Sequence, residues 1–150
     1  YNRLKIDEVF QSEISRAKRY NHPLSIIILD IDYFKLVNDE FGHNVGDETL
    51  ISIAKILKNS IRDTDTVGRW GGEEFMILAS ETTIQNAVLL AEKIRKDISE
   101  FNFNIIGHKT SSFGVSTYHL GDTQEMLVKK ADDALYLAKD KGRDRVEVVE

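Results

Sequence analysis

The chain has 150 residues, no cysteine and a formal net charge of -5, from 20 Lys and Arg against 25 Asp and Glu. The absence of cysteine excludes disulfides, thiolate metal sites and thiol nucleophiles. The acidic balance argues against a general nucleic-acid-binding protein, which normally carries a basic face. The four histidines lack zinc-site spacing, and the sequence has neither a signal peptide nor an apolar run that could span a bilayer. The length and the 41% hydrophobic share fit one globular domain, residues 1–150, with its own core.

The spacing of apolar residues predicts helices that alternate with strands. The predicted helices cover residues 3–19, 33–41, 48–61, 84–99 and 124–139, and a loop, GHNVGD, separates the second from the third. The predicted strands cover residues 24–31, 66–70, 75–79, 110–118 and 145–149. The first strand is an almost continuous apolar run, which is typical of a central strand covered on both faces. The alternation predicts a mixed α/β sheet with helices packed on it.

The stretch RWGGEEF, residues 69–75, lies between the two strands of the predicted hairpin. Gly71 and Gly72 predict a tight two-residue turn, because glycine adopts the positive φ angles that such a turn requires. Taken alone, this turn would leave Glu73 and Glu74 as solvated residues at the tip. Another role for the two glutamates depends on which acidic residues the folded chain brings beside them.

Two further acids stand where the first predicted strand ends. Asp30 and Asp32 are two residues apart, so strand geometry places both on one face. Carboxylates at a strand end beside a hairpin with carboxylates can hold a divalent cation, and Mg²⁺ prefers oxygen ligands completed by water and substrate phosphates. Asp32 could instead cap the short helix that follows. Asp30 ends an apolar strand, so its carboxylate needs a partner that offsets its desolvation.

Four stretches at a characteristic spacing connect the chain to a known family. They are DIDYFKLVNDEFGHNVGDETL (30–50), RDTDTVGRWGGEEF (62–75), SSFGVS (111–116) and ADDALYLAKDKGR (131–143). Through them the sequence resembles the GGDEF family of diguanylate cyclases over nearly its whole length. The resemblance implies a palm-like α/β fold, related to the ferredoxin-like fold, with a mixed sheet of about five strands flanked by helices and a GGEEF β-hairpin. It also implies an enzyme that condenses two GTP molecules into cyclic di-GMP and two pyrophosphates.

The resemblance implies a two-metal active site. Two Mg²⁺ or Mn²⁺ ions would be held by the main-chain carbonyl of Ile31 and by the carboxylates of Asp30, Glu73 and Glu74. Such ions neutralise the triphosphate and lower the pKa of the attacking ribose 3′-hydroxyl. Glu73, where the family more often has aspartate, is also the usual candidate base. The division of metal and base roles between the two glutamates stays open.

Two polar residues match the family's guanine contacts. At Asp47 a carboxylate would accept hydrogen bonds from guanine N1–H and the 2-amino group, while the amide of Asn38 complements the remaining edge. The alternatives are a solvent-exposed helical Asn38 and an Asp47 that caps the following helix. Aromatic and apolar residues nearby are interpreted as core or pocket wall rather than as catalytic groups; they are Phe34, Phe75, Leu135 and Tyr136, with Phe34 among the GTP-binding positions.

The remaining GTP-binding positions concern the phosphates. Lys35, Lys139 and Arg143 occupy the family's triphosphate-binding positions, and Lys35 is counted among the catalytic residues. Without the match to the family's sequence pattern, each of these residues would be interpreted as a solvated surface charge. Gly71 and Gly72 would let the nucleotide approach the backbone closely, where a Cβ atom would obstruct it.

The RDTD stretch matches the family's RxxD inhibitory motif before the GGEEF hairpin. Arg62 supplies forked donors for guanine and phosphate, and Asp65 can accept from guanine N–H groups, so cyclic di-GMP is the implied inhibitor. The alternative is an exposed ion pair. Lys93 and Arg95 are the candidates for the family's additional arginine on the next helix. Asp144 stands where the family often has asparagine, and this departure removes none of the ligands above.

One GTP per domain cannot close a symmetric product, so the resemblance implies an antiparallel homodimer of two half-sites. We expect the chain to be a cytoplasmic fragment of a larger signalling protein, which could itself be membrane-anchored, with a sensor or receiver domain upstream. We expect no nucleic-acid partner and no membrane segment in this chain. The alternative to an enzyme is a catalytically silent module that binds GTP or cyclic di-GMP and acts allosterically.

Overall fold

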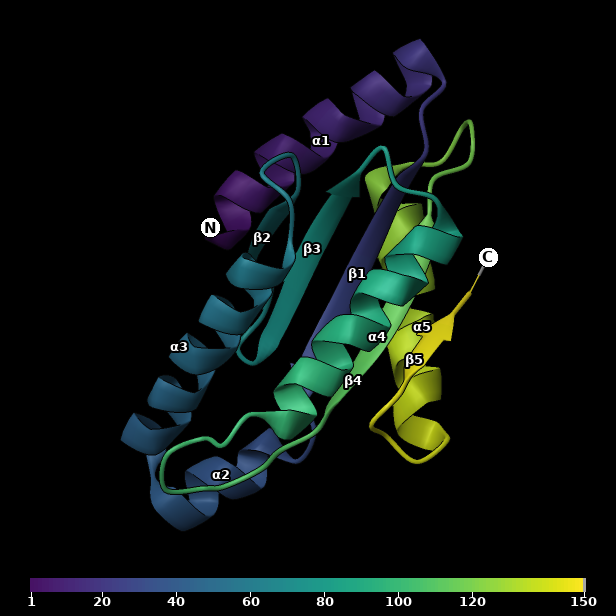
Figure 1. Cartoon of the computed structure of the whole chain (residues 1–150). Coiled ribbons are helices and arrows are strands. Elements are labelled where there is room, and N and C mark those ends of the chain that lie inside the picture. The colour runs from purple at the N-terminus through teal and green to yellow at the C-terminus, as the bar shows by residue number, and fades with distance from the viewer. Residues whose placement is uncertain (150) are drawn as a thin grey trace.

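The computed structural model describes residues 1–149, which form five helices and five strands (Figure 1). The helices are α1 (Arg3–Tyr20), α2 (Phe34–Phe41), α3 (His43–Ser60), α4 (Ile84–Glu100) and α5 (Gln124–Asp140). The strands are β1 (Leu24–Ile31), β2 (Thr66–Arg69), β3 (Glu74–Ser80), β4 (Ser111–Thr117) and β5 (Val146–Val148). The predicted order of helices and strands is confirmed.

The five strands form one mixed sheet in the order β2-β3-β1-β4-β5. The central strand β1 pairs antiparallel with both β3 and β4, and β5 pairs parallel with β4. All eight residues of β1 are buried, as its continuous apolar sequence predicts for a strand covered on both faces. The expected palm-like sheet flanked by helices is therefore present.

Each face of the sheet has its own core because side chains alternate along β1. Ile27 and Leu29 pack with α2, α3 and α4, whereas Ile26 and Ile28 pack with α1 and α5. Figure 1 shows these two helical layers on either side of the sheet. Asp30 continues the even-numbered series, so it points to the α1 and α5 side at the end of the strand.

Gly114 in β4 allows α5 to pack unusually close to the sheet. A Cβ atom at this position would lie 2.1 Å from the Ala131 carbonyl oxygen and 2.4 Å from the Leu135 nitrogen. Both neighbours are backbone atoms of α5, which cannot rotate away. The glycine therefore fixes the distance between α5 and the central strands, and with it the position of the polar residues at the end of α5.

The link between α2 and α3 differs from the prediction. The loop predicted over GHNVGD is wrong, because Gly42 alone, with φ +89°, breaks the chain direction and α3 begins at His43. The weak helix formers in this stretch suggested a loop, but Gly46 packs against α2 and tertiary contacts decide the conformation. Asp47 therefore lies inside α3, and the alternative that it caps the helix is wrong.

The hairpin and one aromatic residue also differ from the prediction. Trp70 and Glu74 are hydrogen-bonded at 2.8 Å, so the three residues 71–73 form the tip, and a two-residue turn is wrong. Gly71 and Gly72 are not among the glycines with positive φ, so the predicted left-handed turn geometry is wrong as well. Tyr136 is 73% exposed on the outer face of α5 and is not part of a core.

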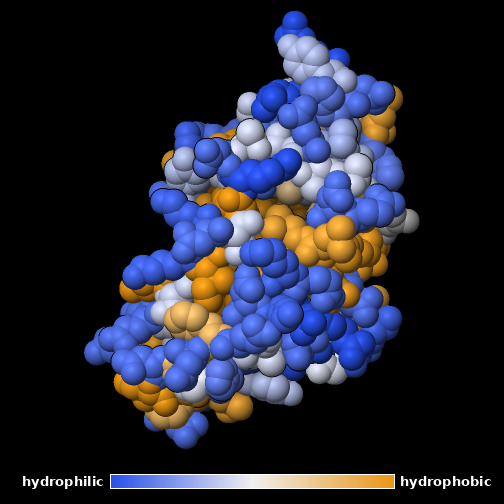
Figure 2. Space-filling model, in the orientation of Figure 1, coloured by the Kyte–Doolittle hydropathy of each residue, from blue (hydrophilic) through white to orange (hydrophobic). Residues whose placement is uncertain are grey.

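The surface is mostly polar, with a band of apolar residues across the face that Figure 2 displays. On α4, Leu89 is 67% exposed and lines a shallow apolar hollow with Val88 and Val148. Within residues 1–149, the helices are too short or too polar to cross a lipid bilayer.

Gly114→Ala is expected to lower the free energy of unfolding by about 1–3 kcal/mol, because the added methyl group forces α5 away from β4. Urea unfolding followed by Trp70 fluorescence measures this change. Gly72→Ala is the matched control, since a Cβ atom there would meet nothing within 4 Å and the change should stay within about 0.5 kcal/mol. A Gly114→Ala variant as stable as the wild type would contradict the close packing.

Candidate active site

Asp30 is the buried acid at the centre of the candidate site. Its side chain is only 2% exposed, and in the sheet it stands between Glu74 of β3 and Ser112 of β4. Lys139 donates from Nζ to Asp30 Oδ2 at 2.5 Å, whereas Oδ1 is buried without a hydrogen-bond partner among residues 1–149. Burial raises the pKa of the Asp30 carboxyl, and the Lys139 charge opposes this effect without cancelling it.

The hairpin and α5 add negative charge around Asp30. Burial raises the pKa of Glu74, and the charges of Asp132 and Asp30 raise it further. Partial burial also raises the pKa of Asp132, with a further contribution from Asp133. Crowded carboxylates with raised pKa values favour the binding of a cation, which would restore their ionised forms.

Asp132 is a member of this acidic group that the sequence reasoning missed. It stands seven residues before Lys139 on α5, a spacing that places two residues on the same helix face. This spacing in ADDALYLAKD was the signal that could have found it. That this face of α5 lies near Glu74 becomes evident only when α5 is packed against β4 and β1.

Asp32 has a structural role instead. Its carboxylate accepts hydrogen bonds from Thr110 Oγ1 at 2.6 Å, from Ser112 Oγ at 2.6 Å and from the Asp144 backbone N–H at 3.0 Å. The residue at the N-cap of α2 is Tyr33, so the alternative that Asp32 caps this helix is wrong. With three donors, Asp32 ties the start of α2 to the segment after α5.

Because Asp32 is occupied by these three donors, the candidate metal ligands are Asp30 and the two hairpin glutamates. Among residues 1–149, no group of three Asp, Glu or His side chains is arranged closely enough to form a complete metal site. The unpartnered buried oxygen of Asp30 and the nearby Glu73 and Glu74 nevertheless fit Mg²⁺, which commonly takes one or two carboxylates and completes its shell with water and phosphate oxygens. Ile31 follows Asp30 at the end of β1, paired with Ser111 of β4.

The residues predicted to contact guanine lie where α2 meets α3. A Cβ atom on Gly46 would come within 1.9 Å of Asn38 Oδ1 and 3.2 Å of Phe34 Cζ. Gly46 therefore allows α3 to approach α2, and the exposed Asp47 follows it directly in α3. Phe34 is 5% exposed and belongs to the core, which agrees with its interpretation as a wall.

The predicted phosphate ligands come from two distant parts of the chain. Lys35 is exposed in the first turn of α2, and Lys139 lies in the last turn of α5. Arg143 follows α5, where its backbone N–H donates to the Ala138 carbonyl oxygen at 2.9 Å. Gly71 and Gly72 are exposed at the hairpin tip.

Comparison with known proteins decides the family. The family model described as "Diguanylate cyclase, GGDEF domain" matches residues 1–145. A diguanylate cyclase of Vibrio cholerae serotype O1 is 44% identical over 146 residues, which cover 96% of this chain and 46% of the relative. Diguanylate cyclase A of Treponema denticola is 43% identical over 137 residues, covering 89% of this chain and 37% of the relative. The chain belongs to the GGDEF domain family of diguanylate cyclases.

Solved structures agree with this assignment. The active GGEEF domain of a diguanylate cyclase from Vibrio cholerae superposes on this GGDEF domain with a TM-score of 0.94 at 42% identity, covering 99% of this chain and 97% of that chain. The GGDEF domain of DgcB from Caulobacter crescentus, in complex with c-di-GMP, has a TM-score of 0.94 at 27% identity. The match covers 98% of this chain and 90% of that chain. The expected family and fold are confirmed. The chain spans less than half the length of the two curated relatives.

The RxxD pair of this GGDEF domain forms a clasp between the segment that precedes β2 and the end of β3. Arg62 donates to Asp65 from Nη2 at 2.9 Å and from Nε at 3.2 Å, and it also donates to the Ser80 carbonyl oxygen at 2.6 Å. Asp65 is 8% exposed and accepts a further hydrogen bond from the Ser80 backbone N–H. The alternative interpretation, an exposed ion pair, therefore fits Arg62, which is exposed, but not Asp65, which is buried.

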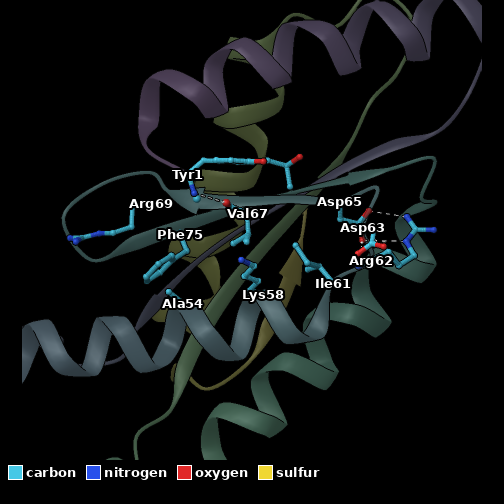
Figure 3. A pocket seen from close by; sticks show the side chains of 12 residues that line it. Tyr1, Ala54, Lys58, Ile61, Arg62, Asp63, Asp65, Val67, Arg69 and Phe75 are labelled. Atoms are coloured by element: carbon cyan, nitrogen blue, oxygen red, sulfur yellow. Dashed lines mark hydrogen bonds and ion pairs between the residues drawn. The ribbon is translucent and has the colours of Figure 1, made fainter.

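A cavity of about 600 Å³ lies between α3 and β2. Figure 3 shows Arg62 and Asp65 at one end of it and Arg69, at the base of the hairpin, at the other, with Lys58 on the α3 side. The two further candidates for the inhibitory site have other partners. Lys93 pairs with Asp97, and Arg95 pairs with Glu92 and with Asp144, each at 2.9–3.1 Å.

Asp30→Asn is expected to raise the free energy of unfolding of the metal-free domain at neutral pH. Because the folded state raises the pKa of Asp30, the folded chain binds more protons than the unfolded chain in the window above the ordinary carboxyl pKa. Stability is therefore lost as the pH rises through that window. Below about pH 3 the carboxyl is mostly protonated in both states and the advantage of asparagine should vanish.

Urea unfolding in EDTA at about pH 3 and about pH 8 measures this difference. The control is Asp133→Asn, whose carboxylate is 53% exposed and pairs with Lys129 on the surface, so it should change stability little at either pH. If Asp30→Asn were no more stable than the wild type at the higher pH, burial of the Asp30 charge would not be costly.

Arg62→Ala is expected to lower the free energy of unfolding by about 1–3 kcal/mol, because it leaves the buried Asp65 carboxylate without its strongest donors. Thermal or urea unfolding measures the loss. Lys129→Ala breaks an exposed ion pair and should cost no more than about 0.5 kcal/mol. Equal stability of the Arg62→Ala variant and the wild type would show that the clasp adds nothing to the fold.

Proposed function

We propose that this domain is an active diguanylate cyclase that condenses two GTP molecules into cyclic di-GMP and two pyrophosphates. The observation that carries the proposal is the buried Asp30 carboxylate, which has one oxygen without a donor among residues 1–149 and stands beside the acids of the GGEEF hairpin. A domain that had lost catalysis would have no need to retain so costly a group. Family membership supports the same reaction.

Two divalent cations, Mg²⁺ or Mn²⁺, are the proposed cofactors. Asp30, Glu73, Glu74 and the Ile31 carbonyl would hold them. When bound, the ions supply charge neutralisation at the triphosphate and acidify the attacking 3′-hydroxyl. Glu74 is fixed in β3 opposite Asp30, whereas Glu73 lies on the hairpin tip. We therefore propose that Glu74 holds metal beside Asp30 of the same copy of the domain. Glu73 would contact the reacting 3′-hydroxyl.

Asn38 and Asp47 are the proposed guanine readers. Asp47 is exposed within α3 and Asn38 is half-buried in α2, so both can present polar atoms beside the Gly46 contact between the helices. A carboxylate accepts from guanine N1–H and the 2-amino group, and adenine lacks this pair of donors. A site built on such hydrogen bonds discriminates by as much as about 10⁴-fold.

Lys35, Lys139 and Arg143 are the proposed triphosphate ligands. Of these, Lys139 pairs with Asp30 Oδ2, so its ammonium group already lies beside a carboxylate that would hold a metal ion. A cation that replaces Lys139 at Asp30 would release this ammonium group for a phosphate oxygen. Binding of metal and binding of triphosphate should therefore support each other.

A symmetric product requires two such sites, so we propose that two copies of the domain face each other in an antiparallel homodimer. Each copy would bring one GTP, and each 3′-hydroxyl would attack the α-phosphate held by the other copy. At low protein concentration the rate per domain should then rise with concentration. The whole chain would act as one catalytic domain in a longer cytoplasmic signalling protein with a sensor or receiver domain upstream.

Product inhibition is the second part of the proposal. The Arg62 and Asp65 clasp borders a large cavity with additional cationic residues, which supports binding of the anionic product there. Arg62 uses its Nε and Nη2 groups within the clasp, and the guanidinium carries further N–H donors on Nη1. Lys93 and Arg95 on α4 would join the site only by exchanging their present carboxylate partners.

Glu73→Gln is expected to lower cyclic di-GMP formation by at least about 10²–10³-fold, because it removes a charge aimed at the reacting groups. The purified chain at high concentration is incubated with GTP and Mg²⁺ or Mn²⁺, and the products are identified by chromatography and mass spectrometry. Glu125→Gln, an exposed change at the far end of α5, is the control and should keep wild-type activity. Mixed ATP and GTP test the guanine preference.

A wild-type chain that forms no product is tested again as a fusion to an artificial dimerisation module. If this fusion binds GTP but still makes no cyclic di-GMP, the domain is a nucleotide-binding module and the proposed enzyme is wrong. If Glu73→Gln retains full activity, the role proposed for Glu73 at the reacting 3′-hydroxyl is wrong.

A further inference from the structure

Two segments that are far apart in sequence meet beside the proposed phosphate ligands, and both have unusual backbones. Tyr33 (φ 57°), Arg143 (φ 64°) and Asp144 (φ 46°) all adopt left-handed conformations without being glycine. This conformation is unfavourable for a residue with a Cβ atom, and it persists only where the surroundings impose it. The residues before α2 and after α5 are therefore held in place by specific contacts.

The contacts that hold them converge on Asp32. Its carboxylate accepts the Asp144 backbone N–H at 3.0 Å, while Asp144 Oδ1 accepts from Arg95 Nη1 at 2.9 Å. Arg143 lies between these anchors and the end of α5. The position of its main chain is thus fixed against the residue that precedes Tyr33.

This arrangement places the Arg143 side chain over an exposed aromatic ring. The guanidinium carbon lies 4.6 Å from the centroid of the Tyr33 ring, although Tyr33 is 58% exposed. A guanidinium that stacks on an aromatic ring uses its flat face, and its N–H donors in the plane of the group stay available for a bidentate acceptor. Because Tyr33 is mostly exposed, its ring gains little from burial, whereas the arginine gains a defined orientation.

We propose that Tyr33 is a positioning residue that holds the Arg143 guanidinium flat, with its N–H edge directed at the phosphates of the bound nucleoside triphosphate. This inference rests on the proposed function, because it assigns Tyr33 to the same site. Tyr33 acts through Arg143 and touches no reacting atom. Its effect therefore concerns affinity for the β- and γ-phosphates and leaves recognition of the base unchanged.

The test compares binding of a non-hydrolysable GTP analogue with binding of GMP, by calorimetry in Mg²⁺ on the 150-residue chain. Tyr33→Asn removes the ring with a residue that tolerates the left-handed conformation, so the fold should be retained, and thermal unfolding checks this. It should weaken analogue binding by about 2- to 5-fold, the range expected from loss of an exposed cation–π contact. GMP binding should not change, and Tyr33→Phe, which keeps the ring, should match the wild type.

The double variant Tyr33→Asn/Arg143→Ala separates positioning from a general structural effect. If Tyr33 acts through Arg143, the double variant should bind the analogue no more weakly than Arg143→Ala alone. Unchanged analogue binding by Tyr33→Asn, or losses that add in the double variant, would overturn the inference. If the wild type forms cyclic di-GMP but Tyr33→Asn binds the analogue as tightly as the wild type, only the role of Tyr33 is rejected. If the wild type does not bind the analogue, both the role of Tyr33 and the proposed function are rejected.

Discussion

A buried carboxylate with only one of its oxygens satisfied is the constraint on which the functional end of this sheet depends. Asp30 ends an otherwise apolar central strand, and Lys139 is the cation that offsets part of its desolvation. The second oxygen has no partner among residues 1–149. Such a group destabilises the fold unless another cation arrives, so the protein retains at this point a local instability that metal binding would relieve.

The architecture around Asp30 follows from a few close contacts. Gly114 brings α5 against β4, which places Lys139 beside Asp30 and the Asp132 charge near Glu74. The register between β1 and β3 sets Glu74 beside Asp30. Two residues further along the chain, the Asp32 carboxylate accepts hydrogen bonds from three donors. One of them is the backbone N–H of Asp144, so Asp32 fixes the segment that carries Arg143. One aspartate is thus available for ligands and the other holds the structure together, although both lie on one face in the sequence pattern.

The sequence predicted most of the fold because the signals were local. The apolar run over residues 24–31 and the helical spacing of the helix-forming segments depend on near neighbours, and the four family stretches placed the site residues in order. The start of α3 was missed because the close approach of Gly46 to Asn38 and Phe34 of α2 is a tertiary contact that the local sequence does not display. The three donors to Asp32 and the placement of the Arg143 guanidinium over the Tyr33 ring join residues far apart in the chain, so no local pattern contains them.

The most direct measurement is titration of the nucleotide-free chain with Mn²⁺, followed in parallel by electron paramagnetic resonance and by thermal unfolding. If the unsatisfied Asp30 carboxylate is a metal ligand, Mn²⁺ should bind saturably and raise the melting temperature of the wild type. Asp30→Asn should abolish both effects. Equal binding and equal stabilisation of the wild type and Asp30→Asn would contradict the role given to this carboxylate, and so would a wild type that takes up no metal.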